Sequence, residues 1–148
     1  MDARAARRGA LAGAAAALAW AGAEPVAGRL LRSPYSDVRL LGRMVVRRGP
    51  GWRAAGVALH TLNGALFGAL FAGLGGRGWR QGLLAAQAES AVLFPGMGLL
   101  DLLHPDVRSG AWPRMVTSPR VLAHEVAMHG LFGAVLGALV ERPDTPPE

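Results

Sequence analysis

Residues 54–74, AAGVALHTLNGALFGALFAGL, form an apolar run without a single Asp, Glu, Lys or Arg. A helix that crosses the hydrocarbon core of a bilayer needs about 20 mostly apolar residues, so this run predicts a transmembrane helix. Two further runs, 81–103 and 121–140, satisfy the same requirement and are bordered by arginine. With a first span at about 9–31, the sequence predicts an all-α integral membrane four-helix bundle in a single membrane domain.

The first run, residues 9–31, is the weakest of the four because it is mostly alanine and contains Glu24, Pro25 and Arg29. The alternative is a cleaved signal peptide over residues 1–23, with a basic start, an apolar centre and an Ala-Gly-Ala cleavage motif. Cleavage there would carry an arginine-rich segment across the membrane, and such segments resist translocation. We therefore expect residues 9–31 to span.

The two halves of the chain resemble each other in order along the sequence. The matching segments are AGAE and AQAE at 21–24 and 86–89, DVR at 37–39 and 106–108, and LFGA at 66–69 and 131–134. Chance similarity is the alternative, because Ala, Gly and Leu are abundant in this chain. The matching acidic residues are harder to explain by chance. Units of two helices repeated in tandem run parallel to each other. The sequence therefore predicts two tandem parallel two-helix repeats.

All sixteen basic residues are arginine, and the formal net charge is +6. The arginines lie between apolar runs and are not interleaved with stacking aromatics, so the expected partner is the lipid bilayer and no nucleic acid. The loops at 32–53 and 104–120 hold more arginines than the opposite ends of the spans. By the positive-inside rule these loops are expected on the cytoplasmic side of a multi-pass protein in the cell membrane. The polar, proline-rich tail, residues 141–148, is expected to be disordered.

An amphipathic surface helix is predicted after the first span. Ser36 and Asp37 can cap it, and Arg39, Arg43 and Arg47 share one of its faces. A helix with an arginine face can lie among lipid headgroups, so these three arginines are predicted headgroup contacts. An ordinary solvated loop helix is the alternative.

Polar residues inside the predicted spans indicate where a function would lie, because each is costly in hydrocarbon unless it faces the bundle interior. Seven such residues form the candidate site: Glu24, His60, Asn63, Glu89, His124, Glu125 and His129. Their expected depths, between mid-bilayer and the loops at 32–53 and 104–120, bring them together. Asp101 and His104 follow a break at Pro95-Gly96 and are expected to cap helices or contact headgroups.

The first functional hypothesis is a metal or haem site, since carboxylate and imidazole ligands suit iron, manganese and zinc. The candidate ligands are Glu24, His60, Glu89, Glu125 and His129. Four-helix di-metal proteins pair a glutamate with a histidine three residues later, whereas Glu125 and His129 are four apart. No HExxH zinc motif occurs either.

Two other hypotheses belong to different classes. One is a proton or small-solute pathway through groups at graded depth, and a protomer of four helices would need a homo-oligomer or a partner membrane protein to enclose it. The other is an accessory or assembly subunit, in which Glu and His pairs only fix the register of the helices. The sequence assigns no catalytic activity, because neither a nucleophile paired with histidine nor a phosphate-binding glycine loop is recognisable.

Overall fold

The computed structural model describes residues 2–140, and within them the chain is helical without strands. The expected disordered tail, residues 141–148, lies outside the described residues. The helices are α1 (Ala3–Leu30), α2 (Asp37–Val45), α3 (Trp52–Gly73), α4 (Gly78–Leu93), η1 (Phe94–Gly96), α5 (Met97–Leu103), α6 (Pro105–Arg108) and α7 (Pro119–Leu139).

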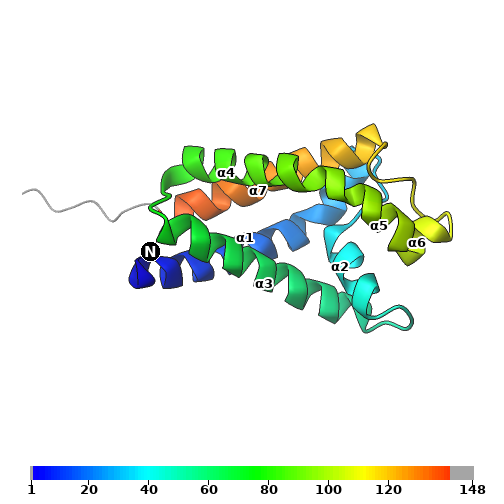
Figure 1. Cartoon of the computed structure of the whole chain (residues 1–148), viewed down its shortest axis with the longest axis horizontal. Coiled ribbons are helices and arrows are strands. Elements are labelled where there is room, and N and C mark those ends of the chain that lie inside the picture. Colours follow the sequence, from blue (N-terminus) through cyan, green and yellow to red (C-terminus); the bar gives the residue numbers. More distant parts are fainter. Residues whose placement is uncertain (1, 141–148) are drawn as a thin grey trace, which may run out of the picture.

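The long helices form two antiparallel pairs (Figure 1). Helix α1 packs along α3, α4 packs along α7, and the two pairs meet where α1 contacts α7. Within residues 2–140, α3 and α4 do not pack side by side along their length. The bundle is therefore closed on the side of α1 and α7 and open between α3 and α4. The short helices α2, α5 and α6 all lie at one end of it (Figure 1).

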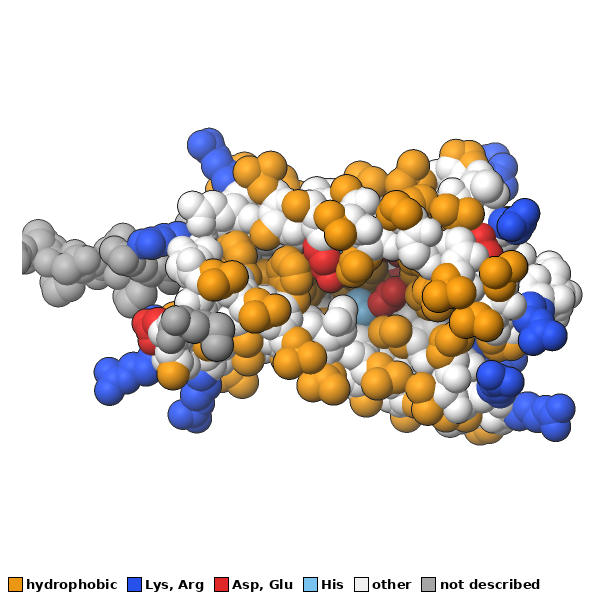
Figure 2. Space-filling view, viewed as in Figure 1, with side chains coloured by type: hydrophobic (Ala, Val, Ile, Leu, Met, Phe, Trp, Pro, Cys, Tyr) orange, Lys and Arg blue, Asp and Glu red, His pale blue; other side chains and the backbone are white. Residues whose placement is uncertain are grey.

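Four helical segments are long and apolar enough to cross a membrane: α1, α3, α4 continued through α5, and α7. Large apolar side chains such as Leu66, Leu84 and Val92 are exposed along these segments. Such a continuous apolar surface is rare on soluble proteins. Figure 2 shows the same pattern, with arginines at the two ends of the molecule and hydrophobic side chains between them. These features suggest a multi-pass membrane protein.

Each antiparallel pair is held together by glycines spaced four residues apart. The facing pairs are Gly9 with Gly68 and Gly13 with Gly64 between α1 and α3, and Gly82 with Gly133 and Gly78 with Gly137 between α4 and α7. A methyl group on Gly13, for example, would collide with the carbonyl oxygen of Gly64. Such small-residue pairs let helix backbones approach closely in a bilayer, where hydrophobic burial does not drive association.

Helix α1, the weakest of the predicted spans, is the central helix of the bundle. It begins at Ala3, with the Asp2 side chain accepting the backbone N–H groups of Arg4 and Ala5, and continues through Pro25 to Leu30. Trp20 and the small residues Ala16 and Ala17 are buried against α3 and α7. Alanine therefore serves in α1 as an interface residue, which explains why hydropathy alone gives it a weak signal.

The end of the bundle that carries the short helices has a hydrophobic cluster of its own. Its buried members are Tyr35, Leu40, Met97, Trp112, Met115 and Val121. Helix α2 reaches this cluster by docking on α3, where Gly42 and Gly56 permit close backbone contact. Between α4 and α5, the one-turn helix η1 contains Pro95, which has no N–H to continue the α-helical ladder. The helix break expected at Pro95-Gly96 is present in the structure.

Candidate functional site

A pocket of about 310 Å³ lies where the bundle is open, between α3 on one side and α4, η1 and α5 on the other. Trp20 of α1, Asp37 of α2 and three residues of α7 complete its lining. Figure 2 shows a hollow on this side of the molecule, with acidic and histidine side chains visible between hydrophobic ones. The polar residues that line the pocket are Asp37, His60, Asn63, Glu89, Ser90, Glu125 and His129. Five of the seven predicted site residues are among them.

His129 of α7 lies between two glutamates. Its Nδ1 is 2.9 Å from the backbone carbonyl oxygen of Glu125, and this nitrogen must carry a hydrogen because a carbonyl only accepts. The carboxylate of Glu125 is 3.5 Å from the same nitrogen. On the other side of the ring, Nε2 is 3.7 Å from Glu89 Oε2, too far for a direct hydrogen bond. A donor that lies beside both atoms can therefore hydrogen-bond to each of them.

His60 of α3 is paired with Asp37, the first residue of α2. Asp37 Oδ2 is 2.6 Å from His60 Nδ1, although the approach is too oblique for a well-formed hydrogen bond. His60 is only 4% exposed, and its Nε2 has no hydrogen-bond partner among the described residues. Trp20 separates the two histidines, with its ring centroid 5.0 Å from that of His60 and 4.7 Å from that of His129.

Tyr35, in the loop before α2, holds the other oxygen of Asp37. Its hydroxyl donates to Asp37 Oδ1 at 3.1 Å. Burial raises the pKa of the Tyr35 hydroxyl well above its usual value, and the carboxylates of Asp37 and Glu125 raise it further. Tyr35 therefore remains a hydrogen-bond donor at any physiological pH and fixes the orientation of Asp37.

Glu24 is not part of the pocket lining. Its carboxylate accepts the Ser36 hydroxyl at 2.6 Å, the backbone N–H of Asp37 at 2.5 Å and the Trp20 indole N–H at 3.3 Å. Because a carboxylate is favoured at the positive end of a helix, Glu24 stabilises the N-terminus of α2 from a neighbouring helix. It acts on the pocket through Asp37 and Trp20, which it positions.

His124 is also outside the pocket, one turn before His129 on α7. It is fully buried, and its ring packs edge-on against Tyr35 with centroids 5.7 Å apart. Neither of its ring nitrogens has a hydrogen-bond partner among the described residues. The structure thus gives His124 a packing position behind Tyr35.

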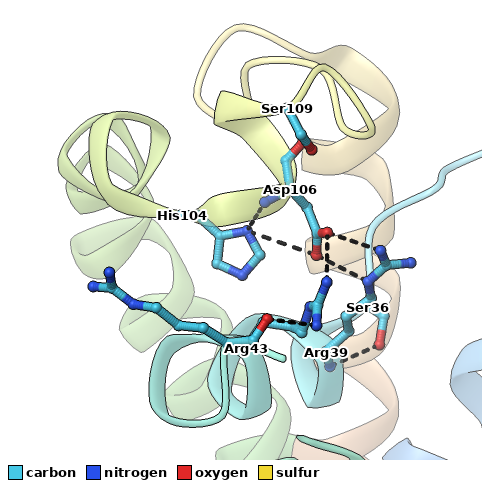
Figure 3. A network of polar contacts seen from close by, with 7 residues as sticks. Ser36, Arg39, Arg43, His104, Asp106 and Ser109 are labelled. Atoms are coloured by element: carbon cyan, nitrogen blue, oxygen red, sulfur yellow. Dashed lines mark hydrogen bonds and ion pairs between the residues drawn. The ribbon is translucent and has the colours of Figure 1, made fainter. Parts of the chain in front are cut away.

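The arginines of α2 face a second polar network (Figure 3). Arg39 makes a bidentate contact with Asp106 of α6, at 2.9 Å from Nε and 2.8 Å from Nη2. Arg43 Nη2 is 3.9 Å from the same carboxylate, while Arg47 is exposed and its backbone carbonyl accepts from Arg43. Of the three predicted headgroup contacts, Arg39 and Arg43 therefore have protein partners.

His104 completes this second network. Its Nδ1 accepts the backbone N–H of Asp106 at 3.3 Å, which caps α6, and its ring stacks on Trp112. Burial lowers the pKa of the His104 imidazole, and the guanidinium groups of Arg39 and Arg43 act in the same direction. Asp101 likewise accepts the backbone N–H groups of Met115 and Val116. His104 therefore has the expected capping role, whereas Asp101 holds the turn at Met115 and Val116, which lies before α7.

Carboxylates outnumber imidazoles in the pocket. Asp37, Glu89 and Glu125 face His60 and His129, and no arginine belongs to the described lining. The remaining lining is apolar and includes the aromatic residues Trp20, Phe67, Phe94 and Phe132. A mostly apolar pocket that contains several carboxylates can bind a small molecule that has a cationic or hydrogen-donating group.

The structure does not gather the five predicted metal ligands. Within residues 2–140, no three His, Asp or Glu side chains come close enough together to hold a metal ion. Glu24 turns toward α2, and His60 and His129 lie on opposite sides of Trp20. Comparisons with protein-family models, curated proteins and solved structures found no match to the chain.

Sequence reasoning missed three pocket residues that have polar side-chain atoms: Trp20, Asp37 and Ser90. Asp37 was interpreted only as a helix cap, because it lies outside the apolar runs. A signal was available, because Asp37 lies in the first turn of a short amphipathic helix. The apolar face of that helix must pack on the bundle, and this packing turns the Asp37 carboxylate toward the pocket. Trp20 and Ser90 carry no charge and did not stand out within their helices.

Proposed function

We propose that the protein is a membrane-embedded binding protein that holds a small ligand in the pocket between α3 and α4. The observation that carries this proposal is a pair of buried polar atoms left without partners at the pocket. His60 Nε2 and Glu125 Oε1 make no hydrogen bond within residues 2–140, and each residue is only 4% exposed. An unsatisfied buried polar atom costs about 1–3 kcal/mol. A ligand that hydrogen-bonds to these atoms recovers that free energy.

The size of the pocket supports the same proposal. Its volume of about 310 Å³ lies at the lower end of the range for small-molecule sites, which runs from about 300 to 1,000 Å³. Most of its lining is apolar, with a few polar groups converging from α2, α3, α4 and α7. This combination is typical of sites that bind small molecules and orient them.

A continuous proton or solute pathway through one protomer has less support. Within residues 2–140, no ionisable side chain lies between the pocket and the end of the bundle at which α1 begins, apart from the terminal residues Asp2, Arg4, Arg7, Arg8, Arg77 and Arg80. That half of the bundle is filled by the glycine contacts between the paired helices. A relay would therefore need a second chain, as a homo-oligomer or as a partner membrane protein.

The proposal includes a duplication of the helix pair. Facing glycines four residues apart join α1 to α3 and also join α4 to α7, which supports two related tandem units. Under this proposal, the two glutamates at matching positions of the repeats, Glu24 and Glu89, now have different roles. Glu24 caps α2, whereas its counterpart Glu89 lines the pocket.

We further propose that α2 lies at the membrane surface. Arg47 is exposed near its C-terminal end, and Val45 is 66% exposed, so both can meet the headgroup region. The arginine-rich loops 32–53 and 104–120 would then face the cytoplasm by the positive-inside rule.

The binding proposal is tested by blocking the mouth of the pocket. Asn63→Phe places a large ring in the pocket from an exposed position, and the adjacent Leu62→Phe, on lipid-exposed surface outside the lining, is the matched control. Each protein is extracted in mild detergent, and the molecules that it retains are identified by mass spectrometry. We expect the parent and Leu62→Phe to retain a small molecule that Asn63→Phe loses. Retention of the same species by all three proteins, or of none by the parent, would contradict the proposal.

Elemental analysis of the same samples tests the metal hypothesis. Stoichiometric iron, manganese or zinc in the parent and in Leu62→Phe, but not in Asn63→Phe, would make the retained ligand a metal ion. An absorption spectrum of the same samples detects haem.

A further inference from the structure

We infer that the ligand is an amphiphile with an ammonium head and an alkyl tail, which enters the pocket sideways from the lipid between α3 and α5. This inference rests on the proposed binding function and adds the chemical class of the ligand and its route of entry. It is carried by the charge of the pocket, by its unpartnered buried oxygen and by the position of its opening.

The charge balance of the pocket favours a cation. Three carboxylates and two imidazoles converge there, and the arginines of the described chain lie outside the lining. A carboxylate in a bilayer is costly unless it is protonated or paired with a positive group. An ammonium group that lies beside His129 Nε2 and Glu89 Oε2, which are 3.7 Å apart, can donate to both.

A second observation points to a donor in the same pocket, on the Nδ1 side of His129. Glu125 Oε1 is buried and has no partner within residues 2–140, and Glu125 lines the pocket from the α7 side. An ammonium group carries several N–H donors and can reach more than one such oxygen. The aromatic rings of Phe67, Phe94 and Phe132 line the same space, and aromatic faces attract ammonium groups.

The route of entry follows from the open side of the bundle. Because α3 does not pack along α4, the pocket faces the flank of the bundle and not one of its ends (Figure 2). Leu93, which lines the pocket, is 60% exposed on that flank, and Leu100 of α5 lies further along the same wall. An alkyl tail can therefore extend from the polar group past these side chains into the lipid.

The experiment compares three probes that share one tail. Thermal unfolding of the protein in a neutral detergent is measured near pH 7 with n-octylamine, 1-octanol or octanoate, which are cationic, neutral and anionic. Glu89→Gln removes one pocket carboxylate without changing side-chain size, and Asp2→Asn removes a carboxylate at the far end as the matched control.

We expect near-saturating octylamine to raise the unfolding temperature of the parent and of Asp2→Asn by about 5 °C. Octanol should give a smaller shift and octanoate none. In Glu89→Gln the affinity for octylamine should fall by about tenfold, while the response to octanol is unchanged.

Two results would overturn this inference and leave the binding function intact. One is an equal shift in unfolding temperature with all three probes. The other is a shift with octylamine that is as large in Glu89→Gln as in the parent. In both cases Asn63→Phe must abolish the shift, which shows that the probe binds in the pocket. Absence of a shift with every probe, in a parent protein that also retains no small molecule, would overturn both proposals.

Discussion

The carboxylate of Glu24, on α1, accepts the backbone N–H of Asp37 at the start of α2, with the two atoms 2.5 Å apart. The same carboxylate accepts the Ser36 hydroxyl, and Ser36 is the N-cap residue of α2. A residue inside one predicted span therefore fixes the start of α2, the helix that supplies Asp37 to the pocket. The relationship explains why a glutamate is present in an otherwise alanine-rich helix.

Glu24→Gln should loosen α2. Glutamine keeps one acceptor oxygen but loses the charge, and hydrogen bonds to a charged group contribute about 1.5–3 kcal/mol. We expect faster hydrogen–deuterium exchange at the backbone amides of α2 and a loss of stability of about 1–3 kcal/mol. The matched control is Glu89→Gln, because Glu89 lines the pocket and bonds no backbone N–H of α2. Equal exchange in the two variants would show that Glu24 does not anchor α2.

Gly13→Ala should separate α1 from α3. A methyl group at Gly13 would collide with the carbonyl oxygen of Gly64, and overpacking of this kind costs about 1–3 kcal/mol. Gly22 lies on the same helix, and a methyl group there would meet no atom within 4 Å, so Gly22→Ala is the matched control. Thermal unfolding in detergent should show a lower midpoint for Gly13→Ala and an equal or higher one for Gly22→Ala, because alanine favours helix. A Gly13→Ala protein as stable as the parent would contradict the close packing of these helices.

The lowered pKa of His104 predicts that acid destabilises the second polar network, formed by Arg39, Arg43, His104 and Asp106. His104 is surrounded by Asp106 and by Arg39 and Arg43 of α2, and its burial keeps the imidazole neutral in the folded protein. An unfolded histidine titrates near pH 6.5. As the pH falls below that value, the unfolded chain takes up a proton that the folded protein does not, so stability decreases by up to about 1.4 kcal/mol per pH unit.

The control for this pH effect is His104→Asn. Asparagine can accept the backbone N–H of Asp106 as a helix cap, and it does not titrate. Thermal unfolding midpoints measured between pH 7.5 and 5.5 should decrease more steeply for the parent than for His104→Asn. Parallel pH profiles would mean that His104 does not contribute to the acid sensitivity.

The spans of this fold were largely predictable from sequence because they depend on one strong property, the length of apolar runs. The break at Pro95 was also predictable, since proline cannot donate to the helical ladder. The order in which the helices pack was not, because it depends on contacts such as Gly9 with Gly68 that are specific in space and ordinary in composition. Gly133 and Gly137 are four residues apart and so share a helix face, but that spacing does not identify α4 as the helix that faces them.

The candidate site was predictable in composition and only partly in arrangement. Depth along the helices predicted a common location for His60, Glu89 and His129, and all three line the pocket. Depth could not show that Glu24 turns toward α2, because one of its partners is the backbone N–H of Asp37, and backbone groups leave no trace in sequence patterns. Arg39 was expected to contact lipid headgroups because its partner, the side chain of Asp106, lies 67 residues away in the chain.

The central claim is that the polar pocket lies within the bilayer and opens toward lipid, and the lack of native cysteine makes a direct test simple. A nitroxide is attached at Asn63→Cys, at the mouth of the pocket, in protein reconstituted into vesicles, with Leu62→Cys and Arg48→Cys as lipid-facing and aqueous references. Electron paramagnetic resonance then measures how often the nitroxide at each site collides with oxygen and with a water-soluble nickel chelate. We predict that oxygen dominates at Asn63 as at Leu62, and that the chelate dominates at Arg48. Chelate collisions at Asn63 equal to those at Arg48 would contradict the claim.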